Sequence, residues 1–120
     1  VAQSLPALLS AHKQQGRAAR VGLDWPDTEG PLDKIAEELV EVAGAANDAE
    51  RHEEVGDLLF AVVNYARHLG VDAEGALRDA NVKFARRFAA MEARAGGSLS
   101  GLSLDVQESH WLAVKVSERP

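Results

Sequence analysis

Apolar residues recur along most of the chain at the spacing of an α-helix, and this periodicity limits the fold more than any other feature. The clearest stripe follows the i, i+3, i+4, i+7 pattern and consists of Leu32, Ile35, Ala36, Leu39, Val42, Ala43 and Ala46. The sequence contains no alternating strand pattern of useful length and no internal repeat. An all-α fold is therefore predicted.

Turn residues divide the periodic segments into five expected helices. Pro6 and Pro31 suit first turns, Asn47 or Asp48 suits an N-cap, and Gly70 suits a helix end. The expected helices are residues 4–19, 31–46, 49–69, 73–94 and 105–117.

Short connections favour antiparallel neighbours, so the second and third expected helices should form a hairpin. A chain of 120 residues is one domain of ordinary size, and we expect a single domain over residues 1–120. The third helix is apolar on several sides, which favours association. The predicted fold is an antiparallel helical bundle that dimerisation completes.

Composition narrows the range of partners. The net charge of −6 disfavours nucleic acid, and no segment approaches the ~20 apolar residues of a membrane span. The chain contains no cysteine, which excludes thiolate chemistry and fits a reducing, cytoplasmic environment. It opens with valine, so we expect a processed start or a fragment of a longer protein.

Two pairs of carboxylates border the apolar stripes of the expected hairpin. Glu38 and Glu41 lie one turn apart on its first helix, and Glu54 and Asp57 lie one turn apart on its second. If the helices pack, the four groups converge at a partly buried seam, where they repel one another unless protonated or paired. A hard divalent cation such as Mg²⁺ removes that cost. The alternative is that these acids are solubilising surface charges.

The same segments resemble the MazG family of all-α nucleoside triphosphate pyrophosphohydrolases. "EELVE" at residues 37–41 and "EVGD" at residues 54–57 match its E-E-x-x-E and E-x-x-D signature. "GRAARVGLDW", "GPLDKIAEELVEV", "EEVGDLLFAVVNYARHLG" and "ANVKFARRF" extend the likeness over nearly the whole chain, especially to the C-terminal half of two-domain bacterial members.

The resemblance implies an activity and a set of site residues. Family members cleave a nucleoside triphosphate to the monophosphate and pyrophosphate, and they usually act as homodimers. By position, the Mg²⁺ ligands would be Glu38, Glu41, Glu54 and Asp57, with Mn²⁺ as a possible substitute. Lys83 and Arg87 match residues that meet the triphosphate, and Trp111 matches an aromatic residue near the base.

Other candidates come from the residues themselves. Glu53 is the first candidate for a general base and Glu37 the second, because each adjoins the carboxylate cluster. Lys13 and Arg17 are four apart and form a further candidate pair for phosphate, although a solvated helix face explains them equally well. Likewise, Trp111 could stack on a base or fill a core or dimer seam.

Three rival functions follow from the same pattern. One is a narrower enzyme of the same fold that acts on dUTP or a modified nucleotide. Another is a non-catalytic helical interaction module, which would release no pyrophosphate. The third, a di-iron bundle, requires Glu-x-x-His pairs, and the sequence contains none.

Overall fold

The computed structural model describes residues 5–119 and confirms the all-α fold. The described residues form five helices and no strand: α1 (Ala7–Arg20), α2 (Glu29–Ala43), α3 (Asp48–His68), α4 (Ala73–Arg94) and α5 (Leu104–Ser117). None of these helices combines the length and apolar character that crossing a membrane requires. Residue 4, the first of the predicted first helix, lies outside the described residues.

The ends of α2 differ from the prediction at both sides. The helix begins at Glu29, whose backbone N–H donates to the Asp27 carboxylate at 3.0 Å, so Pro31 is the third helical residue and not the first. It ends at Ala43, because Gly44 takes the C-cap position and its N–H donates to the carbonyl oxygen of Val40. The helix is therefore shifted toward the N-terminus.

The predicted cap of α3 is confirmed. Asn47 is the N-cap, and its side-chain oxygen accepts from the backbone N–H of Glu50 at 2.9 Å. The Glu50 carboxylate reaches back to the backbone N–H of Ala46 at 2.8 Å. These two hydrogen bonds satisfy orphan donors at the turn and fix the direction in which α3 leaves it.

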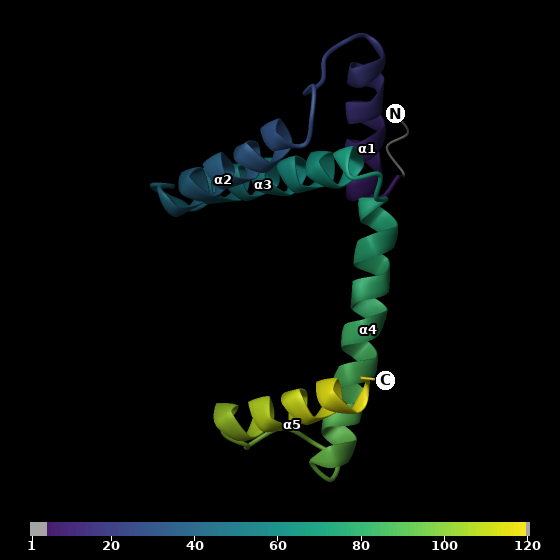
Figure 1. The fold of residues 1–120 in the computed structure, drawn as a ribbon. Helices are drawn as coiled ribbons and strands as arrows, with labels where there is room; N and C mark the ends of the chain where they lie inside the picture. The colour runs from purple at the N-terminus through teal and green to yellow at the C-terminus, as the bar shows by residue number, and fades with distance from the viewer. Residues whose placement is uncertain (1–4, 120) are drawn as a thin grey trace. The chain divides into compact units, whose positions relative to one another are not determined.

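The chain divides into two compact units, Val1–Ala76 and Leu77–Pro120. In the first, α2 and α3 lie side by side as the predicted hairpin, and α1 packs on α3 (Figure 1). In the second, Met91 of α4, Val114 of α5 and Leu99 of the connecting loop form a small core. The prediction of one domain over residues 1–120 stays a prediction.

The loop between α1 and α2 is tied to α3 by one carboxylate. Asp24 Oδ1 accepts from Arg67 at 2.5 Å and from the backbone N–H of Trp25 at 2.9 Å, and it lies 2.8 Å from His68 Nε2. The hydrogen bond from Arg67 is the main reason why the pKa of Asp24 is lowered from 3.8 to about 2. The side chains that hold Asp24 therefore favour its ionised form in the folded protein.

This network predicts a loss of stability in acid. The pKa of Asp24 is lower in the folded state, so its contribution is present above the unfolded value of 3.8 and is lost as pH falls toward about 2. Asp24→Asn should reduce the fall in the free energy of unfolding over this range. Urea unfolding, followed by Trp25 fluorescence in a Trp111→Phe background, measures it. If the free energy of unfolding falls with pH as steeply in Asp24→Asn as in the matched variant Asp33→Asn, Asp24 contributes nothing to the loss of stability in acid.

Candidate metal centre

The hairpin brings three of the four predicted ligands together. One carboxylate oxygen from each of Glu38, Glu54 and Asp57 lies within 4.8 Å of the other two. Glu38 comes from α2, and Glu54 and Asp57 lie one turn apart on α3. Helical spacing on α3 and the packing of α2 against it therefore produce the cluster.

Burial of Glu38 gives the cluster its chemical character. Glu38 is 6% exposed, and only one of its two carboxylate oxygens has a partner: Lys34 Nζ, 3.1 Å from Oε1. The other oxygen, Oε2, is buried and has no hydrogen-bond partner. A buried carboxylate oxygen without a partner is costly, and a bound cation would satisfy it.

Electrostatics point the same way. Partial burial and the neighbouring negative charges of Glu41, Asp57, Glu38 and Glu53 raise the pKa of Glu54. The hydrogen bond to Glu38 raises the pKa of Lys34, which keeps that amine charged. The cluster repels its own negative charge, and one lysine compensates only part of it. The donor set of hard, partly buried oxygens fits Mg²⁺ or Mn²⁺.

Glu41 is not part of this three-residue group. It is exposed near the end of α2, although its charge is close enough to raise the pKa of Glu54. Its role as a fourth ligand stays a prediction.

The two candidate bases differ in their surroundings. Both Glu37 and Glu53 are exposed. Lys34 Nζ lies 3.3 Å from Glu37 Oε1, whereas no described side chain pairs with Glu53. Of the two candidates, only the Glu53 carboxylate has no ion-pair partner among the described residues.

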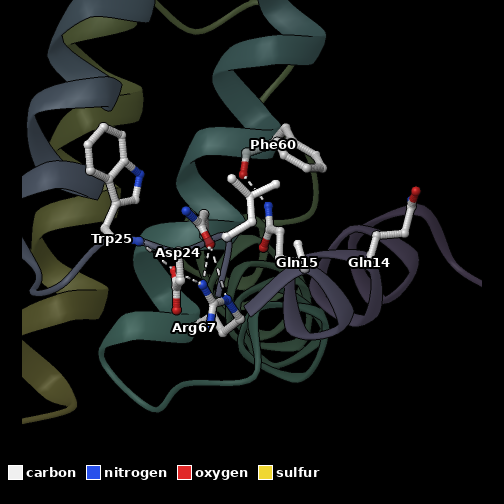
Figure 2. A pocket seen from close by; sticks show the side chains of 9 residues that line it. Gln14, Gln15, Asp24, Trp25, Phe60 and Arg67 are labelled. Carbon is white, nitrogen blue, oxygen red and sulfur yellow. Dashed lines mark hydrogen bonds and ion pairs between the residues drawn. The ribbon is translucent and has the colours of Figure 1, made fainter. Parts of the chain in front are cut away.

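One cavity opens beside the cluster, and a second cavity adjoins the first. The first, here the carboxylate cavity, has a volume of about 370 Å³ and is lined by Trp25, Lys34, Glu38, Asp57, Phe60, Ala61 and Asn64. The second, the amide cavity, has a volume of about 430 Å³ and is lined by Gln14, Gln15, Ala18, Leu23, Asp24, Trp25, Phe60, Asn64 and Arg67 (Figure 2). Trp25, Phe60 and Asn64 belong to both linings. The cavities therefore adjoin, and a ligand of nucleotide length has room across them.

Glycine at position 30 makes room for Trp25. A Cβ atom at Gly30 would lie 2.5 Å from the indole Cδ2 and Cε3 atoms, far inside van der Waals contact. The indole therefore rests against the first turn of α2, and Trp25 as a whole is 46% exposed. In this position Trp25 forms part of the walls of both cavities.

Gly30→Ala should displace the indole of Trp25. We expect a change in Trp25 fluorescence in a Trp111→Phe background and a destabilisation of at most about 1–3 kcal/mol, the scale of overpacking. The matched variant is Gly16→Ala, because a Cβ atom there meets nothing within 4 Å. It should instead stabilise α1 by roughly 0.5–1 kcal/mol. Unchanged fluorescence in Gly30→Ala would show that the indole does not rest on this glycine.

The predicted phosphate and base contacts are distributed over both units. Lys13 and Arg17 are exposed on α1, and no described side chain pairs with either. In the second unit, Lys83 is exposed on α4. Arg87 donates to the Glu118 carboxylate at 2.8 and 2.9 Å and lies over the Trp111 ring at 5.4 Å from its centroid.

Other residues of the second unit contact Arg87 and Trp111. The Arg87 hydrogen bond is the main reason why the pKa of Glu118 is lowered. Phe84 lies 6.2 Å from Trp111 between ring centroids and 5.9 Å from Phe88. The contacts of Lys83, Arg87 and Trp111 with a nucleotide stay predictions.

Sequence reasoning missed Gln15 and Arg67, which line the amide cavity. Gln15 lies seven residues after Leu8, on the apolar face of the first helix, and a polar residue at such a position was the available signal. Its partner is the backbone carbonyl of Phe60, which no local pattern identifies.

Comparison with known proteins agrees with this site. The MazG nucleotide pyrophosphohydrolase domain model matches residues 28–90, which include the whole carboxylate cluster. The chain belongs to the MazG family. The resemblance seen in the sequence is thereby confirmed.

Curated relatives extend the match beyond this MazG domain. A nucleoside triphosphate pyrophosphohydrolase of Escherichia coli K12 is 46% identical over 126 residues, which covers 98% of this chain and 48% of the relative. The nucleoside triphosphate pyrophosphohydrolase/pyrophosphatase MazG of Thermotoga maritima is 44% identical over 114 residues, covering 92% and 45%. The chain thus spans about half the length of these relatives.

Proposed function

We propose that this MazG domain hydrolyses nucleoside triphosphates to the monophosphate and pyrophosphate in a Mg²⁺-dependent reaction. The observation that carries the proposal is the cluster of Glu38, Glu54 and Asp57, in which a buried Glu38 oxygen lacks a partner. The names of the relatives support the reaction, and the adjoining cavities support a substrate with a charged and an apolar part.

Glu38, Glu54 and Asp57 would hold the metal, with Glu41 as a proposed fourth ligand. When bound, Mg²⁺ neutralises charge on phosphate oxygens and makes a water molecule more acidic. Lys34 remains positively charged in the carboxylate cavity, where it can attract the triphosphate. From the resemblance we also propose that Lys83 and Arg87 contact the triphosphate and that Trp111 contacts the base.

The remaining task of the protein is to accept the proton of the attacking water. We assign this to Glu53, because it is near enough to influence Glu54 and no described side chain pairs with it. Glu37 is the alternative, but its carboxylate already has a partner, because Lys34 Nζ lies 3.3 Å from Glu37 Oε1. Phosphoryl transfer otherwise depends on positioning the substrate and neutralising its negative charge. The carboxylate cluster, through its metal, and the basic side chains would provide both.

We further propose a cytoplasmic homodimer. Large apolar side chains of the α2–α3 hairpin are exposed in the single chain, among them Leu32, Leu39, Val40, Leu59 and Val62. A second copy that covers this surface would remove it from water.

A product assay tests the reaction. ³¹P NMR of the chain with each of the four common nucleoside triphosphates and Mg²⁺ should show the monophosphate and pyrophosphate, and chelation of Mg²⁺ should stop their release. Diphosphate and orthophosphate as primary products would contradict the proposed bond cleavage. No pyrophosphate from any canonical or modified nucleotide would instead favour an interaction module, and turnover of dUTP or a modified nucleotide alone would favour the narrower enzyme.

A further inference from the structure

The amide cavity contains two carboxamide side chains whose orientations are fixed by their neighbours. The first is Gln15, which is 6% exposed and donates from Nε2 to the backbone carbonyl of Phe60 at 2.9 Å. A carbonyl oxygen only accepts hydrogen bonds, so the NH₂ group of Gln15 must face it. What Gln15 has left to offer is its oxygen, Oε1, and this atom is buried without a hydrogen-bond partner.

The second carboxamide is Asn64, and it is fixed in the opposite sense. Arg67 donates from Nε and Nη2 to Asn64 Oδ1 at 3.1 and 2.9 Å. A guanidinium group only donates, so the oxygen of Asn64 must face it and the NH₂ group is left over. No described residue accepts a hydrogen bond from that NH₂ group. Arg67 is itself held by Asp24 (Figure 2).

The cavity therefore presents one fixed acceptor and one fixed donor between apolar walls. Trp25, Phe60 and Leu23 line it, and its volume of about 430 Å³ is within the range of ligand sites. A buried acceptor left without a partner is unfavourable, and this indicates that a ligand donor completes it. Each of the common nucleobases is flat and carries a donor beside an acceptor on its pairing edge.

We propose that Gln15 and Asn64 bind the polar edge of the nucleobase, with Arg67 and Asp24 as positioning residues for the Asn64 amide. Gln15 accepts from the base, Asn64 donates to it, and Trp25 and Phe60 contact its faces. This inference rests on the proposed function, because it places the base beside the metal cluster through the residues that both cavities share.

The test measures binding and does not need turnover. The probes are two non-hydrolysable nucleoside triphosphates: one with the natural base that binds most tightly, and one with benzimidazole, which lacks a pairing edge. Calorimetry with Mg²⁺ gives the ratio of the two Kd values. The wild-type chain should prefer the natural base, and the loss of one hydrogen bond should reduce this preference about tenfold.

Three variants separate recognition from folding. Asn64→Asp keeps an acceptor for Arg67 but removes the donor, Gln15→Met removes the acceptor, and Arg67→Lys removes the forked contact that orients Asn64. Each should lower the preference about tenfold. The matched control is Asn47→Asp, the same substitution at the exposed N-cap of α3, because Asn47 lines neither cavity and aspartate also caps helices.

The outcomes are distinguishable from those of the product assay. An unchanged preference in folded Asn64→Asp and Gln15→Met, or equal binding of both probes by the wild-type chain, would overturn the inference. Lower preference in these variants supports it even if the chain releases no pyrophosphate, in which case the proposed reaction alone fails.

Discussion

Glu38→Gln should reduce Mg²⁺-dependent pyrophosphate release by at least about 100-fold, since losses of 10–100-fold follow even from disturbing outer-shell partners of a metal. Glu38 carries the buried oxygen that lacks a partner and is the one cluster member from α2. The amide that replaces the carboxylate carries no charge and offers one oxygen instead of two. Steady-state release of pyrophosphate measures the effect.

The same variant should lose its stabilisation by Mg²⁺. In the wild-type chain, Mg²⁺ at 100 times its Kd should raise the free energy of unfolding by about 2.7 kcal/mol, if it binds only the folded state. Asp33→Asn is the matched control, because Asp33 lies on α2, is exposed and is not in the cluster. It should keep both activity and stabilisation. Wild-type turnover in Glu38→Gln would count against the metal assignment.

Glu53→Gln should lower kcat by about 10²–10⁴-fold, the usual contribution of a general base. Glu53 is the carboxylate next to the cluster with no described partner, whereas Lys34 lies 3.3 Å from Glu37. Glu37→Gln is therefore the natural comparison. It should change kcat less than about fivefold, because an exposed ion pair such as Lys34–Glu37 contributes little free energy.

The two substitutions also decide between the two candidate bases. A larger loss of kcat in Glu37→Gln than in Glu53→Gln would assign the base to Glu37. If both substitutions have equal and small effects on kcat, neither Glu53 nor Glu37 is the general base.

Local patterns predicted much of the fold. Apolar periodicity located all five helices, and Asn47 marked the turn that makes α2 and α3 a hairpin. The shift of α2 was missed because hydrogen bonding decides helix ends: the Asp27 carboxylate binds the first turn and Gly44 takes the C-cap position.

The candidate site was predictable in part, for a related reason. Glu54 and Asp57 share one helix, so their proximity follows from sequence spacing, and the hairpin adds Glu38. Glu41 shows the limit, since the rotation of α2 against α3 decides which of its acids faces the seam. The amide cavity depends on contacts between residues far apart in sequence, such as Gln15 with Phe60, and these require the tertiary structure.

The account depends on a divalent ion at Glu38, Glu54 and Asp57, and anomalous diffraction from crystals of the chain grown with saturating Mn²⁺ tests this most directly. We predict an anomalous peak in coordinating contact with oxygens of all three side chains. A map without a peak at these carboxylates, or with the ion bound only elsewhere, would contradict it.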